Sequence, residues 1–161
     1  MAVDMFLKIE GIDGDATDKL HEKWINLLSF SWGLSQDRGK ESGGGSASGK
    51  VAIQDFSFVK NVDKASPQLM QAGCEGQHYP SASLAVRSSL RGDNSSLAAN
   101  AVAGAPGDFL TLKLTDILVS SIRPGGNSNT DDQPMESVSL NFHKIEFLYT
   151  APDGTQVNGA T

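Results

Sequence analysis

Apolar residues in this chain recur mainly at every second position, the spacing of β-strands that bury one face. The clearest example runs from Asn26 to Gln36, where larger apolar residues alternate with very small ones. The predicted core face of this segment carries Leu28, Phe30, Trp32 and Leu34. Its other face carries Ser29, Ser31, Gly33 and Ser35.

The same alternation predicts two long strands later in the chain. One runs from Phe109 to Ser121 and changes phase around Asp116, which indicates a bulge or a strand covered on both faces. The other runs from Ser137 to Tyr149 and changes phase near His143. Shorter strands are predicted at Val3–Ile9, Val51–Lys60 and Ser83–Ser88.

One short helix is predicted between these strands. Ser66 is a suitable N-cap, Pro67 suits the first helical position, and Gly73 suits the C-terminal stop. Long strands in near-continuous succession with a single helix predict a mainly β fold. We expect a single-domain β-barrel over residues 1–161, with one short flanking α-helix and extended loops.

Charge and composition exclude several classes of function. The net charge of −6 leaves no dense basic surface of the kind that binds nucleic acid or an anionic membrane. Cys74 is the single cysteine, so no intramolecular disulfide can form. The first residues lack the pattern of a Sec signal peptide, and no apolar stretch approaches the ~18–20 residues of a membrane helix. We therefore expect a chain made in the cytoplasm, with no membrane insertion.

Motifs that could carry chemistry are weak in this sequence. Gly44 to Lys50 has the spacing of a phosphate-binding loop, but Val51 replaces the magnesium-binding hydroxyl and begins a strand-like segment. A hairpin loop is therefore favoured there over a nucleotide site. Neither the histidines nor Cys74 have metal-ligand spacing, and we expect Cys74 to be a small packed side chain. We predict no catalytic residue, no cofactor and no metal, with a hydrolase using Cys74 or a histidine as the remaining enzymatic alternative.

The small face of the Asn26–Gln36 segment has two interpretations. Ordinary solvent-facing strands prefer Lys, Glu and Thr, whereas this face is small and uncharged. It could lie close to a neighbouring backbone, or it could line a channel and avoid tight binding to passing cargo. The pattern alone does not choose between the two.

Eight segments, in order along the chain, resemble the Hcp family (haemolysin-coregulated protein) of the type VI secretion system. They extend over nearly the whole chain, and their combination is more specific than any one of them. The segments are Met1–Ile9, Leu27–Gln36, Gly49–Val51, Gln54–Lys60, Asp63–Met70, His78–Pro80, Leu118–Ser121 and Glu136–Phe142.

The resemblance implies a β-barrel that forms homohexameric rings, which stack into the inner tube of a contractile injection apparatus. It implies secretion through that apparatus, with spike and sheath components and protein effectors as partners. Residues of the small face would lie near the lumen, with Ser31 the strongest candidate among Ser29, Ser31, Gly33 and Ser35. The Asp37–Gly49 loop would reach a neighbouring subunit or ring through Gly43, Gly44, Gly45 and Ser46.

Two departures from the family pattern stand out. The Arg91–Asp108 segment is longer and richer in Ala, Asn and Ser than the family's usual turn, and the chain ends at Thr161 where many relatives continue to another strand. A ring-shaped effector receptor or chaperone that acts without stable tubes is the alternative to the tube subunit.

Overall fold

The computed structural model describes residues 3–37, 50–88, 107–129 and 132–161. Strands dominate the described chain, which confirms the predicted mainly β fold with one short helix. The strands are β1 (Val3–Ile9), β2 (Ile25–Asn26), β3 (Ser29–Ser31), β4 (Leu34–Asp37), β5 (Lys50–Ile53), β6 (Phe56–Asn61), β7 (His78–Ser88), β8 (Asp108–Gly125), β9 (Met135–Thr150) and β10 (Gln156–Ala160). The helix is α1 (Ser66–Glu75).

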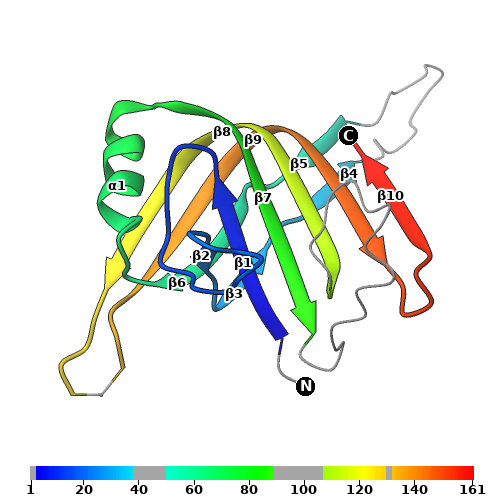
Figure 1. Ribbon diagram of the computed structural model, residues 1–161. Helices are drawn as coiled ribbons and strands as arrows, with labels where there is room; N and C mark the ends of the chain where they lie inside the picture. The colour runs from blue at the N-terminus through cyan, green and yellow to red at the C-terminus, as the bar shows by residue number, and fades with distance from the viewer. Residues whose placement is uncertain (1–2, 38–49, 89–106, 130–131) are drawn as a thin grey trace, which may run out of the picture.

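The main sheet is antiparallel and strongly curled, as Figure 1 shows, with the strand order β2-β1-β7-β8-β9-β6-β3. Its two ends are bridged by the short segment that contains both β2 and β3. In that segment the Leu27 N–H donates to Met5 O at 3.0 Å, and the Leu28 N–H donates to Val59 O at 2.8 Å. One stretch of chain therefore bonds to the first edge and then to the last edge of the sheet, which gives the predicted barrel-like curl.

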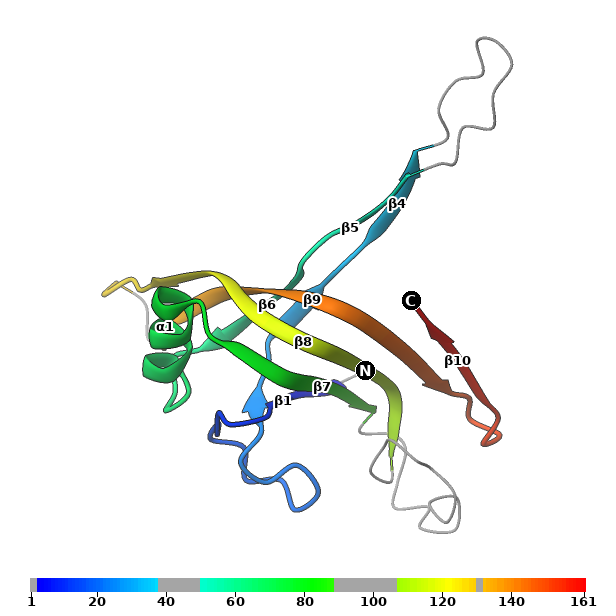
Figure 2. The same cartoon turned by 90° about the horizontal axis from the view of Figure 1, so that it is seen from above.

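Strands β6 and β10 pair with the same edge of β9 at different heights. The β6 strand pairs with residues 135–140 of β9, and β10 pairs with residues 146–150. Between them the chain leaves the sheet as the two-stranded β4–β5 ribbon, which Figure 2 shows extending away from the barrel. The wall is therefore split along the middle of β9.

The core lies on the concave side of the sheet and is closed at one end by α1. Leu69 and Ala72 are the buried residues of the helix, which packs against β8. Among the described residues, no helix is long and apolar enough to cross a membrane. The largest fully buried apolar side chains are Leu7, Ile9, Ile25, Phe56, Phe58, Leu69, Leu84, Leu112, Leu114, Ile117 and Leu140.

The predicted phase changes in the two long strands are confirmed, and they occur side by side. Leu114 and Ile117 are three positions apart, so a regular strand would place them on opposite faces, yet both are buried. Asp116 between them has a φ of 53°. The β8–β9 register nevertheless continues from Thr115–Lys144 to Ile117–Phe142, so both strands turn over together. A separate register shift lies between Val119 and Ser121.

The prediction of one continuous strand from Asn26 to Gln36 is wrong. The segment is divided among β2, β3 and β4 because it crosses from one sheet edge to the other and then enters the ribbon. The residues that face the core also differ from the prediction. Leu27 is buried, whereas Leu28 and Leu34, which were assigned to the core face, are exposed. The predicted Val51–Lys60 strand is likewise divided between β5 and β6.

The predicted helix ends also need correction. Ala65 and not Ser66 is the N-cap, and the C-cap is Gly76 with a φ of 62°, whereas Gly73 lies inside the helix. A left-handed C-cap favours glycine, and two glycines three residues apart made the choice ambiguous in the sequence.

Two further expectations differ from the structure. Cys74 is exposed and is not packed in the core, because it lies on the outward side of α1. The alternation predicted no strand after Tyr149, whereas the structure has β10, which pairs with β9. Its sequence, with Asn158 and Gly159 at its centre, has weak strand propensity, which is why the pattern did not predict it.

Candidate functional site

Cross-strand pairing extends the small face of β3 over four neighbouring strands. Ser31 lies opposite Ser57 on β6, Ser57 opposite Ser139 on β9, and Ser139 opposite Ser121 on β8. The Ser57 and Ser139 hydroxyls are 2.9 Å apart and hydrogen-bonded. The result is a row of hydroxyls across the sheet, on the side opposite the core residues Phe56, Phe58, Val138 and Leu140.

A second row runs alongside the first. Ser29 lies opposite Val59, Val59 opposite Ser137, and Ser137 opposite Arg123. We define the serine face as Ser29, Ser31, Ser57, Ser121, Ser137 and Ser139. Short hydroxyl side chains carry no net charge and each offers one hydrogen-bond donor and up to two acceptor sites, so this face offers weak, nonspecific contacts.

An acidic group marks one border of the serine face. The Asp55 carboxylate accepts hydrogen bonds from the Ser120 hydroxyl at 2.6 Å and from the Asn141 side-chain amide at 3.1 Å. These bonds join β8 and β9 to the turn between β5 and β6. The root of the ribbon is thereby fixed to the sheet beside the serine rows.

The predicted lumen residues do not all lie together. Ser29 and Ser31 are exposed on the serine face, whereas Ser35 is exposed on the ribbon strand β4. Gly33 lies in the link between them, where its carbonyl accepts a 2.8 Å hydrogen bond from the Gln54 N–H. The predicted loop residues Gly43, Gly44, Gly45 and Ser46 lie outside the described residues.

Four members of the serine face were not predicted: Ser57, Ser121, Ser137 and Ser139. The signal was present, because each serine in β6 and β9 occupies the polar position of a period-two pattern. What the sequence did not provide was the pairing that places these positions next to Ser31.

The other candidate residues from the sequence analysis lie in a strand, in a surface ion pair or on the exposed side of the helix. Lys50, the last residue of the phosphate-loop spacing, begins strand β5, so the required helix does not follow. His78 pairs with Asp116 at 2.9 Å on the surface, and Cys74 is exposed on α1. Within the described ranges, no group of three or more His, Cys, Asp or Glu residues could hold a metal ion.

His21 is buried in a polar cluster beneath the 10–24 segment. Its Nδ1 lies 2.8 Å from an Asp18 oxygen and its Nε2 lies 3.1 Å from an Asp108 oxygen. Its ring stacks on Phe6 at 4.4 Å. Burial lowers the pKa of His21, but the hydrogen bonds and charges of Asp108 and Asp18 outweigh burial and raise this pKa above its ordinary value.

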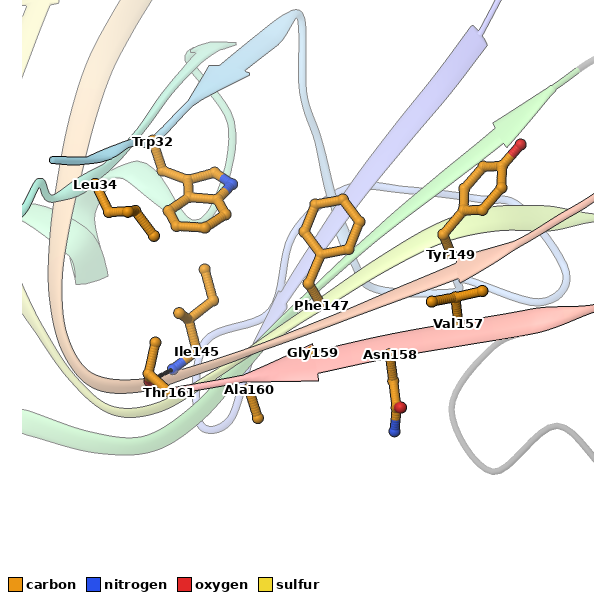
Figure 3. Close-up of a pocket in the computed structure, with 10 residues that line it drawn as sticks. All are labelled: Trp32, Leu34, Ile145, Phe147, Tyr149, Val157, Asn158, Gly159, Ala160 and Thr161. Atoms are coloured by element: carbon orange, nitrogen blue, oxygen red, sulfur yellow. Dashed lines mark hydrogen bonds between the residues drawn. The ribbon is translucent and has the colours of Figure 1, made fainter. Parts of the chain in front are cut away.

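A large apolar groove lies at the split in the sheet wall, on the concave side of β9 and β10. Figure 3 shows Trp32 and Leu34 across from Phe147, Tyr149 and Val157. The space that they help to line has a volume of about 550 Å³. We call this the apolar groove. Its lining residues include no charged side chain: Trp32, Leu34, Ile145, Phe147, Tyr149, Val157, Asn158, Gly159, Ala160 and Thr161.

Comparison with known proteins agrees with this architecture. Residues 6–149 match the family described as "Type VI secretion system effector, Hcp". The chain is 41% identical over 149 residues to Protein hcp1 of Pseudomonas aeruginosa, covering 92% of this chain and 84% of that protein.

Solved structures show the same fold over almost the whole chain. The crystal structure of Hcp1 from Salmonella typhimurium aligns with a TM-score of 0.78 and 29% identity, over 99% of this chain and 94% of that one. A type VI secretion system effector from Yersinia pestis aligns with a TM-score of 0.76 and 25% identity, over 98% of each chain. The chain therefore belongs to the Hcp family of the type VI secretion system.

Proposed function

We propose that this chain is the structural subunit of the type VI inner tube, and that six copies form a ring whose lumen is lined by the serine face. On this proposal the rings stack and leave the cell through the type VI apparatus, in contact with its spike and sheath and with protein effectors. The protein acts by assembly and not by catalysis.

The observation that carries the proposal is the row of hydroxyls on β3, β6, β9 and β8. A channel wall must contact cargo without retaining it, and a row of short, uncharged side chains meets that requirement. A ring of identical subunits would repeat the row around its axis. Ser31 lies at one end of the row and is exposed.

Substitution of Ser31 by Gln tests the lumen assignment. The longer side chain narrows the channel and adds a strong amide donor and acceptor, so effector retention should fall several-fold while rings still form. The measurement is the amount of effector co-purified per ring. Ser128→Gln is the matched control, because Ser128 is exposed in the β8–β9 connection, away from the serine face.

Equal retention by the wild type and Ser31→Gln, with rings intact in both, would contradict the lumen assignment. Electron microscopy of the same samples verifies that the rings are intact. If retention falls equally in the Ser128→Gln control, the effect is not specific to the serine face and the assignment also fails.

A further inference from the structure

The two ring nitrogens of His21 both face carboxylates, which constrains the protonation state of the ring. Nδ1 lies 2.8 Å from an oxygen of Asp18, and Nε2 lies 3.1 Å from an oxygen of Asp108. An ionised carboxylate only accepts hydrogen bonds, whereas a neutral imidazole has one N–H and one lone pair. A neutral ring would therefore turn its lone pair toward one carboxylate. The imidazolium donates to both, so the geometry fits the doubly protonated ring.

The charges around His21 depend on its proton. In the described chain they are Asp18 of the same segment, Asp108 of β8, Arg87 of β7, and Asp4 of β1, which pairs with Arg87. Without the imidazolium charge, Arg87 alone would face the three carboxylates. The side chains of His21 and Asp108 are each 1% exposed, so water screens the added repulsion poorly. Although burial lowers it, the pKa of His21 is raised by Asp108 and Asp18, in agreement with this arrangement.

The segment that carries His21 forms backbone hydrogen bonds within itself. We call residues 10–24 the latch segment. The Gly14 N–H donates to Lys23 O at 2.7 Å, and the Lys23 N–H donates to Ala16 O at 3.0 Å. The Ala16 N–H donates to Trp24 O at 2.9 Å. These bonds join the two arms of one small loop, and a loop of this size is marginally stable at best by itself.

Side chains attach the latch segment to the barrel. Ile12 and Ala16 are buried. The His21 ring stacks on Phe6 of β1, and its bond to Asp108 reaches β8. Because the loop needs such contacts to stay folded, weakening the His21 attachment should let the whole segment open at a lower cost than global unfolding.

We propose that the latch segment is a pH-sensitive device: the His21 imidazolium attaches it to β1 and β8, and loss of the ring proton favours its release while the barrel stays folded. The segment leads directly into β2 and β3, which bridge the two ends of the sheet, and β3 carries Ser29 and Ser31. Its release therefore frees the chain that enters this bridge. The proposal concerns a single chain and does not depend on the ring.

Amide hydrogen exchange of the full chain, followed by mass spectrometry from pH 6 to pH 9, tests the latch segment. Exchange is expressed as protection relative to the chemical rate at each pH, which removes the direct effect of hydroxide. Protection of residues 12–24 should fall about ten- to a hundredfold over this range, the factor that one charge-assisted hydrogen bond represents. At every pH it should also be lower than the protection of β8 and β9, because the segment opens while these strands stay paired.

Two substitutions identify the titrating group. His21→Gln removes the charge, so protection of the latch segment should be low and nearly independent of pH. His78→Gln is the matched control, because His78 also pairs with an aspartate, Asp116 at 2.9 Å, but its side chain is 62% exposed. This control should keep the pH response of the wild type.

Asp108→Asn separates charge from shape. The introduced amide has nearly the size of the carboxylate, and its N–H can donate to an unprotonated Nε2 of His21. The neutral ring can then be held at pH 9, so most of the pH response should disappear. A role of Asp108 in packing alone does not predict this result.

Protection of the wild-type latch segment that stays constant from pH 6 to pH 9 would overturn the proposal. Equal protection of this segment and of β8 and β9 would also overturn it, because the opening would then be global unfolding. A full pH response in His21→Gln, or its loss in His78→Gln, would assign the titration to another group. If His21→Gln does not fold, a full pH response in Asp108→Asn overturns the proposal in its place.

Discussion

His21 is a buried ionisable side chain that connects distant parts of the described chain. It is 1% exposed, stacks on Phe6 of β1, and bonds to Asp18 in its own segment and to Asp108 at the start of β8. Arg87 at the end of β7 completes the cluster through a 2.8 Å ion pair with Asp18. The imidazole therefore joins the 10–24 segment to β1 and β8, and the Asp18–Arg87 pair adds β7.

Stability should depend on pH through His21. Its pKa is raised in the folded state by the carboxylates of Asp108 and Asp18, against the opposing effect of burial. A raised pKa means that the stabilisation is fully present below the ordinary value of 6.5 and is lost as pH rises through the folded value. The free-energy difference between wild type and His21→Gln, from urea unfolding at one protein concentration, should be largest near pH 6 and shrink toward pH 9.

At acid pH a different group, Asp18, contributes to the pH dependence of stability. The wild type and His21→Gln are therefore compared only between pH 6 and pH 9. Although burial opposes it, the pKa of Asp18 is lowered by His21 and Arg87, so its contribution is lost only as pH falls below about 3.8. A wild-type advantage that stays constant from pH 6 to pH 9 would show that the charge of His21 does not stabilise the fold.

At the scale of elements, the alternation of apolar and polar residues predicted the features that are set within a single strand. The β1 range and the phase changes in β8 and β9 followed from alternation within each strand. The Asn26–Gln36 prediction failed because hydrogen bonds to Met5 and Val59, at opposite ends of the sheet, divide that segment. Such bonds join residues far apart in sequence, and no periodicity records them.

The start of α1 is fixed by a buried polar network that was also absent from the sequence prediction. The Lys60 ammonium is fully buried and pairs with Asp63 and Glu136. Ser66, at the first helical position, donates from its hydroxyl to Glu136 Oε1 at 2.6 Å. The hydroxyl expected to cap the helix thus ties it to β6 and β9.

Breaking this network on one side should destabilise the protein strongly. Glu136→Leu leaves the Lys60 charge buried beside a single carboxylate, at a cost of about 3–5 kcal/mol in the free energy of unfolding. The double variant Lys60→Met with Glu136→Leu removes both buried charges and should recover a large part of that loss. Urea denaturation of the two variants and the wild type measures both effects. A double variant as unstable as Glu136→Leu would contradict the charge-based explanation.

At the scale of the whole molecule, the sequence located part of the candidate site. Ser29 and Ser31 were predicted from alternation and resemblance, whereas Ser57, Ser121 and Ser139 join them only through the pairing order β3-β6-β9-β8. The apolar groove was not predicted, because it depends on β6 and β10 sharing one edge of β9. Surfaces that several distant strands build together emerge only from the fold.

The solution mass of the purified protein, measured by light scattering across a dilution series, tests the central claim most directly. The ring proposal predicts a closed species of about six subunits that persists over a range of concentrations, as a cyclic assembly with one repeated interface should. A protein that stays monomeric at every concentration would contradict the proposal that it is a ring-forming tube subunit.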